Sequence, residues 1–111
     1  MTEKEEQYLV RLLTSPLYTP KHCFYNGQMI ALNGGGFAYY EGYAQNSKWE
    51  INFEHGWLVK NGKVFDPTWK DGTEYFGLKI PTEFIRKNVL ETGEAQPLFS
   101  CYIRERMEEC Q

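Results

Sequence analysis

The sequence has no excess of basic residues. Its 111 residues include 12 lysines and arginines against 15 aspartates and glutamates, which gives a formal net charge of -3. The two signs are interspersed along the chain, whereas a nucleic-acid binder normally concentrates its lysines and arginines in a patch or stripe. The composition therefore argues against nucleic acid as a partner.

Long apolar runs are also missing. No stretch approaches the roughly eighteen consecutive apolar residues that indicate a membrane-spanning helix. The first residues, MTEKEEQ, are acidic where a secretory signal would be basic. We therefore expect a protein that does not enter a membrane and that resides in the cytoplasm.

Cysteine and histidine are scarce and scattered. The three cysteines stand at positions 23, 101 and 110, and the two histidines stand at positions 22 and 55. An odd number of cysteines at distant positions fits neither a disulfide framework nor the paired spacing of a zinc site. Reduced thiols are expected, with no metal and no other cofactor.

Aromatic residues, in contrast, are abundant. Eight tyrosines, seven phenylalanines and three tryptophans make up 16% of the chain. No internal repeat, linker or low-complexity tract divides the sequence, and a chain of this length can bury one substantial core but not two. We therefore predict a single compact domain over residues 1–111.

The strongest local signal is a β-hairpin centred on Asn61-Gly62. This dipeptide stands between two runs of alternating apolar residues, and it favours a two-residue type I′ turn because both positions need a positive φ. A two-residue turn fixes the register of the two strands. That register places Trp57 opposite Asp66 and His55 opposite Thr68.

The same register brings His55 and Asp66 together. Side chains alternate between the two faces of a strand, so both residues project from one face as diagonal neighbours on adjacent strands. We therefore predict a hydrogen bond between the imidazole and the carboxylate, which is the oriented-base half of a catalytic triad. The alternative is a structural pair, in which His55 is a half-buried polar residue and Asp66 binds its own backbone ahead of Pro67.

Two helices are expected ahead of the hairpin. The first covers residues 3–13, where apolar residues recur at helical spacing behind an acidic first turn. The second begins with Thr19 as N-cap and Pro20 at its first position, and it runs to about Leu32, before the break at Gly34-Gly35-Gly36.

The second of these helices carries Cys23 in its first turns. Its face continues through the small residues Gly27 and Ala31, which would let the helix lie close to a sheet. Because His55 alternates with apolar residues along its strand, we expect this helix to pack on the His55 face. A helix N-terminus stabilises a thiolate and an imidazole can take its proton, so this placement predicts a cysteine nucleophile. The alternative is an inert buried thiol.

The rest of the chain completes a fold of the α+β class. A strand is expected over residues 75–80, a helix from Pro81 to about Leu90 with Gly93 as its stop, and an edge strand over residues 98–103. The charged residues that follow would form a solvated tail or a short helix. The predicted architecture places the N-terminal helices on an antiparallel β-sheet.

The order of these pieces resembles the transglutaminase-like branch of the papain-like cysteine enzymes. The matching segments cover residues 20–69 and are Cys23 in KHCFYNGQMIAL, Glu41-Gly42-Tyr43, His55-Gly56-Trp57 and Asp66-Pro67-Thr68-Trp69. The resemblance implies a papain-like or transglutaminase-like fold and a catalytic triad of Cys23, His55 and Asp66.

The function expected from this triad is cysteine-dependent acyl transfer, or hydrolysis of an amide or ester. Cys23 would attack the carbonyl, His55 would shuttle the proton and Asp66 would orient His55, while backbone N–H groups at the start of the Cys23 helix would form part of the oxyanion hole. Hydrolysis and transfer differ only in the group that resolves the acyl-enzyme, and the sequence does not separate them.

The expected substrate is a peptide, a protein or a small-molecule amide. The residues expected to bind it are aromatic side chains of the matching segments, Trp57, Trp69 and Tyr43. The alternative function is a non-catalytic binding module that uses the same cleft to hold a small molecule or a peptide.

Overall fold

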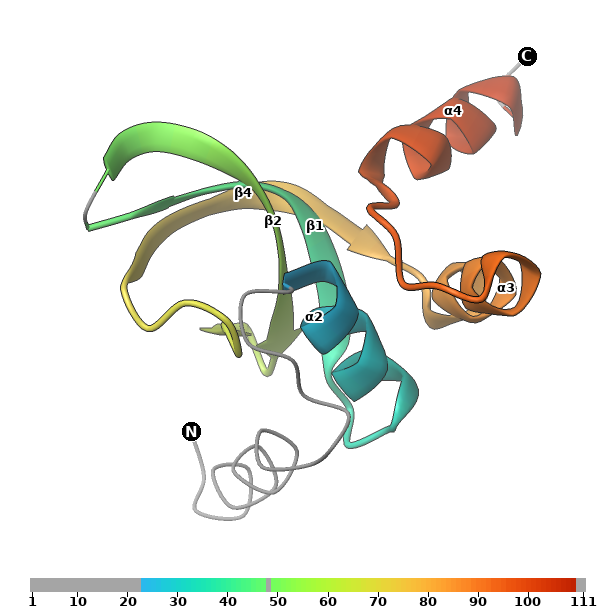
Figure 1. Ribbon diagram of the computed structural model, residues 1–111, viewed down its shortest axis with the longest axis horizontal. Coiled ribbons are helices and arrows are strands. Elements are labelled where there is room, and N and C mark those ends of the chain that lie inside the picture. The colour runs from blue at the N-terminus through green and yellow to red at the C-terminus, as the bar shows by residue number, and fades with distance from the viewer. Residues whose placement is uncertain (1–22, 48, 110–111) are drawn as a thin grey trace.

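A computed structural model shows the fold and describes residues 23–47 and 49–109 (Figure 1). The predicted helix over residues 3–13, the predicted helix start at Thr19-Pro20 and Cys110 lie outside these ranges. In chain order, the described elements are α2 (Cys23–Leu32), β1 (Ala38–Asn46), β2 (Trp49–Lys60), β3 (Lys63–Phe65), β4 (Gly72–Ile80), α3 (Thr82–Thr92) and α4 (Phe99–Glu109).

The strands form one curled antiparallel sheet in the order β3-β2-β1-β4. Trp57 on β2 and Tyr75 on β4 are separated by β1, yet the centroids of their rings lie 5.0 Å apart. Strands two positions apart in a flat sheet are separated by about 9.5 Å, so these side chains meet because the sheet bends around them. We call their side of the sheet the inner face and the opposite side the outer face.

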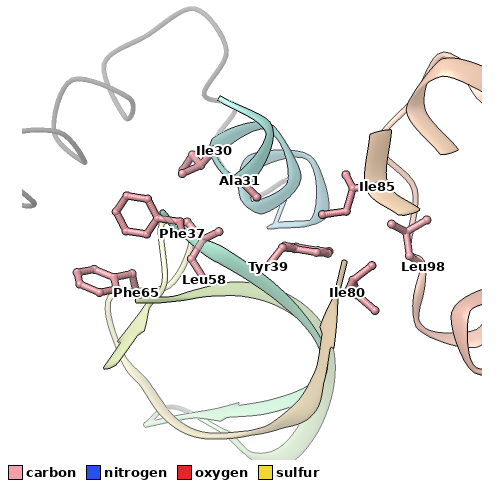
Figure 2. Packing of buried hydrophobic residues seen from close by; sticks show 9 residues of the cluster. All are labelled: Ile30, Ala31, Phe37, Tyr39, Leu58, Phe65, Ile80, Ile85 and Leu98. Carbon is pink, nitrogen blue, oxygen red and sulfur yellow. The ribbon is translucent and has the colours of Figure 1, made fainter. Parts of the chain in front are cut away.

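The main hydrophobic core lies between α2 and the outer face (Figure 2). Directly opposite residues share a face, so the pairing of Tyr39 with both Leu58 and Ile80 places three large side chains in one row towards α2. Gly27 lets the helix approach this row, because a Cβ atom there would lie 2.7 Å from Cε1 of Tyr39. The core is completed by Ile30, Ala31, Phe37, Phe65, Ile85 and Leu98.

The prediction that α2 packs on the His55 face is wrong. His55 is paired with Gly42, one position out of step with the pairing of Leu58 and Tyr39, so its side chain belongs to the inner face. Large apolar residues occupy both faces of β2: Trp57 is 2% exposed and Leu58 is fully buried. Alternation along this strand therefore does not reveal which face a helix covers.

The β2–β3 hairpin has the predicted turn and register. Asn61 and Gly62 have positive φ values of 54° and 75°. The strand pairs are Leu58↔Phe65, Val59↔Val64 and Lys60↔Lys63. The turn chemistry of Asn61-Gly62 thus determines the alignment of the two strands, as expected for a two-residue type I′ turn.

β3 is shorter than predicted, because it ends at Phe65. The expected strand pairing of Asp66 and Thr68 with β2 is therefore wrong. Oδ1 of Asp66 accepts hydrogen bonds from the backbone N–H groups of Thr68 and Trp69, at 3.0 and 2.9 Å. This local turn of the Asx type competes with the ladder and leads the chain out of the sheet.

The strand predicted over residues 75–80 lies within β4, and the helix predicted from Pro81 is α3. Gly93 ends α3 with a φ of 77°, and its N–H group donates to the carbonyl of Val89 at 2.8 Å. A left-handed residue after the last turn is the conformation that glycine adopts without steric cost, so the predicted stop is confirmed.

The prediction of an edge strand over residues 98–103 is wrong, because this segment opens α4. The Glu41 carboxylate on β1 accepts the N–H groups of Leu98 and Phe99 through one oxygen, Oε1, at 2.6 and 2.8 Å. A helix start needs acceptors for such N–H groups. Here the acceptor stands more than fifty residues earlier in the sequence, so no local signal marks the helix start.

These elements make a small α+β domain in which helices accompany an antiparallel sheet, which is the coarse fold class predicted from the sequence. Within residues 23–47 and 49–109, no helix has both the length and the apolar character needed to cross a membrane.

Candidate active site

The predicted hydrogen bond between His55 and Asp66 is present. Nε2 of His55 lies 2.7 Å from Oδ2 of Asp66, and the side chains of the two residues are 1% and 5% exposed. A carboxylate only accepts hydrogen bonds, so Nε2 carries the proton and donates it. Nδ1 is then the ring nitrogen left to face another group.

Four donors hold the Asp66 carboxylate in place. Oδ1 accepts the backbone N–H groups of Thr68 and Trp69, and Oδ2 accepts the hydroxyl of Tyr75 at 2.7 Å in addition to His55. The backbone bonds proposed by the structural alternative therefore exist together with the bond to the imidazole. One oxygen anchors the loop, and the other orients His55.

Cys23 supplies the third group of the predicted triad. It is half-buried at the first described position of α2, and its thiol is near enough to His55 to be one of the causes, after Asp66, that raise the pKa of the imidazole. Asn26, one turn further along α2 and 1% exposed, donates from Nδ2 to Oγ1 of Thr68 at 3.1 Å. This bond joins the first turns of α2 to the loop that carries Asp66.

The imidazole of His55 favours its protonated form. Burial alone would lower its pKa, but the hydrogen bonds with Asp66 and Cys23, together with the charges of both groups, raise the pKa from 6.5 to about 9. A raised histidine pKa beside a thiol favours transfer of the thiol proton to the ring. The site is therefore suited to hold a thiolate and an imidazolium as an ion pair.

Aromatic rings enclose the imidazole on the inner face. Trp69 stacks on His55 with a centroid distance of 3.9 Å and an interplanar angle of 18°, and Trp57 lies 6.2 Å away at 19°. The ring of Tyr75 also lies within 6.4 Å. Such packing fixes the ring plane and excludes water from the hydrogen bond between His55 and Asp66.

The three aromatic residues that were predicted to bind substrate differ in their positions and in their exposure. Trp69 lies half-buried against His55. Trp57 is 2% exposed, so it is a packing residue behind the imidazole. Tyr43 is 44% exposed but pairs with Glu54, which puts its side chain on the outer face, away from His55.

Tyr75 is the site residue that the sequence reasoning missed. Its role depends on the pairing of β4 with β1, which aligns Ala44 with both Phe53 on β2 and Tyr75 on β4. β4 lies at the sheet edge opposite β3, although it follows β3 in the chain. β4 is not joined to its sheet neighbour β1 by a short turn. No dipeptide signal therefore fixes the register of β4, as Asn61-Gly62 does for β3.

Among the residues that the structure describes, no group of three His, Cys, Asp or Glu side chains is arranged to hold a metal ion. Comparison of the chain with protein-family models, curated proteins and solved structures found no match. The features that bear on function are therefore the geometry of Cys23, His55 and Asp66 and their order in the sequence.

Proposed function

We propose that this protein is a cysteine-dependent acyltransferase or hydrolase that acts on an amide or an ester. The observation that carries the proposal is a buried His55 that donates to a carboxylate, Asp66, held by four donors, with the half-buried thiol of Cys23 near enough to raise the pKa of the imidazole. The transglutaminase-like order of the sequence segments supports the same chemistry and the finer fold assignment.

In the proposed reaction the thiolate of Cys23 attacks the carbonyl carbon, and the carbon–sulfur bond forms as the carbonyl electrons move to oxygen. Collapse of this intermediate breaks the bond to the leaving amine or alcohol, which takes the proton from Nδ1 of His55. Water or an acceptor amine then attacks the thioester, His55 removes its proton, and Cys23 is regenerated.

Asp66 has two tasks in this scheme. It keeps the proton of His55 on Nε2, so that Nδ1 faces the thiol, and it stabilises the imidazolium. The start of α2 has a third, because the N–H groups of a first helical turn lack intrahelical partners and carry partial positive charge. These groups would stabilise the thiolate and contribute to the oxyanion hole.

A purely structural role explains less of this arrangement. A buried histidine paired with an aspartate satisfies both polar groups, and many cores contain such pairs. That pair does not require a half-buried thiol near the imidazole. It also does not require a bond such as the one from Asn26 to Thr68, which sets the first turns of α2 against the Asp66 loop.

A reactive thiol needs a reducing compartment, so a cytoplasmic location stays our prediction.

The test is the reactivity of Cys23 against pH. The full-length protein is labelled with iodoacetamide, and each cysteine is followed by peptide mass spectrometry. At about pH 6, where free thiols are almost fully protonated, we expect rapid labelling of Cys23 and little labelling of Cys101, whose pKa is raised by burial. His55→Gln should abolish this difference.

A second readout links the thiol to acyl chemistry. Cys23 should release p-nitrophenol from p-nitrophenyl acetate in a burst and carry the acetyl group, and Cys23→Ser should show no burst. If Cys23 labels with the pH profile of Cys101 and His55→Gln leaves that profile unchanged, the proposal is overturned. The non-catalytic binding module then becomes the better hypothesis.

A further inference from the structure

An apolar strip leads away from His55 along the inner face of the sheet. Side chains alternate along β2, so Phe53 projects from the same face as His55, and Ile51 follows it towards the turn between β1 and β2, where the pairing of the two strands shifts register. A strand advances about 3.3 Å per residue, which places Phe53 about 7 Å and Ile51 about 13 Å from His55. The edge of the Phe53 ring meets Trp69, with a centroid distance of 5.8 Å and an interplanar angle of 88°.

The described neighbours of Phe53 across the sheet are uncharged. Ala44 and Tyr75 lie beside Phe53 in the same row across the sheet, because Ala44 pairs with both. Glu54, the charged residue between Phe53 and His55, is exposed but projects from the outer face. A charged side chain laid along the strip would lose hydration without gaining a partner, whereas an apolar one would lose no polar contact.

The strip is accessible, and the main core does not use it. Ile51 is 56% exposed and Phe53 is half-buried, whereas the core cluster lies on the outer face under α2. An exposed apolar residue alone is common on protein surfaces. Here the exposed residues continue directly from the ring that covers His55, since Phe53 contacts Trp69 and Trp69 stacks on the imidazole.

We propose that Ile51, Phe53 and Trp69 form the binding strip for the acyl donor, and that the donor carries a large apolar or aromatic side chain. This inference rests on the proposed function, because it assigns a substrate class to the same site. An extended peptide repeats at the same spacing as β2, so a donor laid along the strand can place its side chains on Phe53 and Ile51 while its carbonyl lies near His55. The strip excludes acidic and basic donor side chains by their desolvation cost.

The test uses N-acetyl amino-acid p-nitrophenyl esters as acyl donors. In each reaction the ester carbon–oxygen bond breaks, a thioester forms on Cys23 and p-nitrophenolate leaves. Esters of phenylalanine and leucine should acylate Cys23 about tenfold or more faster than esters of glycine and aspartate, after correction for their rates of hydrolysis in water.

Variants then locate the preference. Ile51→Thr keeps a β-branched side chain on the strand, and Phe53→Ala removes the ring. Both should lower the preference for phenylalanine and leucine esters several-fold. Val64→Thr also introduces a β-branched hydroxyl side chain, at an apolar residue of β3 that is 45% exposed, and it should leave the preference unchanged. The iodoacetamide rate of Cys23 shows whether each variant keeps its triad intact.

The possible results separate the two proposals. If Cys23 is acylated by all esters at similar corrected rates, or if Ile51→Thr and Val64→Thr behave alike, the binding strip is refuted while the acyl chemistry stands. If no ester acylates Cys23, although iodoacetamide labels it, the proposed function itself fails and the assignment of the strip fails with it.

Discussion

Replacement of Asp66 by asparagine should lower the pKa of His55 and reverse the tautomer of its ring. The wild-type pKa is raised to about 9, although burial alone would lower it, because Asp66 and Cys23 favour the protonated form. In Asp66→Asn the negative charge is gone and burial is opposed by Cys23 alone. The new Nδ2 group of residue 66 can donate to Nε2 of His55, which moves the ring proton to Nδ1, the nitrogen that must accept the thiol proton.

The effect on stability follows from the change in pKa. The rise from 6.5 in the unfolded chain to about 9 in the folded protein corresponds to about 3 kcal/mol. Because the folded pKa is the higher one, this contribution is fully present below about pH 6.5 and is lost as the pH rises through about 9. The unfolding free energy of the wild type should therefore exceed that of Asp66→Asn by the largest amount at about pH 6. This difference should become smaller towards about pH 10.

Three measurements on one set of proteins test this prediction. The Cε1 resonance of His55, assigned with His55→Gln, gives the pKa by NMR titration. Urea unfolding at several pH values gives the stability difference, and iodoacetamide labelling of Cys23 at about pH 6 should slow by about tenfold or more in Asp66→Asn. Asp71→Asn is the matched control: it makes the same chemical change a few residues away, where the carboxylate accepts from Ser47 instead of His55.

Two results would contradict this role of Asp66. One is a wild-type His55 that titrates near 6.5, because Asp66 and Cys23 would then raise the pKa of His55 no more than burial lowers it. The other is an Asp66→Asn protein in which the His55 titration and the labelling rate match those of Asp71→Asn. In that case the carboxylate would serve the loop through its Oδ1 bonds alone, and the pair would be structural.

Two further predictions concern the framework of the site. Gly27→Ala should cost about 1–3 kcal/mol of unfolding free energy and slow Cys23 labelling, because the new Cβ would lie 2.7 Å from Cε1 of Tyr39 and would push α2 off the sheet; a stability equal to wild type in urea unfolding would contradict this packing. Glu41→Ala should remove the protection of residues 99–109 in hydrogen exchange, because it leaves two N–H groups at the start of α4 without their acceptor. Glu54→Ala, an exposed carboxylate on the neighbouring strand, is its control, and equal protection in both variants would show that Glu41 does not hold α4.

The parts of the fold and site that could be predicted are those determined by local chemistry. Asn61-Gly62 accepts only a narrow set of backbone conformations, so it fixes the strand register as far as Phe65, and Asp66 then meets His55 from the turn that follows. The stop of α3 at Gly93 has the same origin. In each case the residues that decide the structure stand within a few positions of the feature that they determine.

The parts that could not be predicted depend on distant residues. α4 starts where Glu41 receives its N–H groups, and segment 98–103 carries no sign of that acceptor. The side of the sheet that α2 covers is decided by the row of Tyr39, Leu58 and Ile80, and β2 is apolar on both faces. Tyr75 reaches Asp66 only because the pairing of β4 with β1 places it in that row of the inner face.

The curl of the sheet is what joins these distant residues into a site. At its centre Gly42 pairs with Gly77, where the two backbones come so close that a Cβ atom on Gly42 would lie 2.2 Å from the carbonyl oxygen of Phe76. A Cβ atom on Gly77 would lie 2.7 Å from Cη2 of Trp57, so the missing side chains make room for the indole across the sheet. Trp57 then packs beside both Tyr75 and His55. The burial of the imidazole therefore depends on two glycines on neighbouring strands, and the same burial makes the hydrogen bond that His55 donates to Asp66 decisive for the pKa of the imidazole.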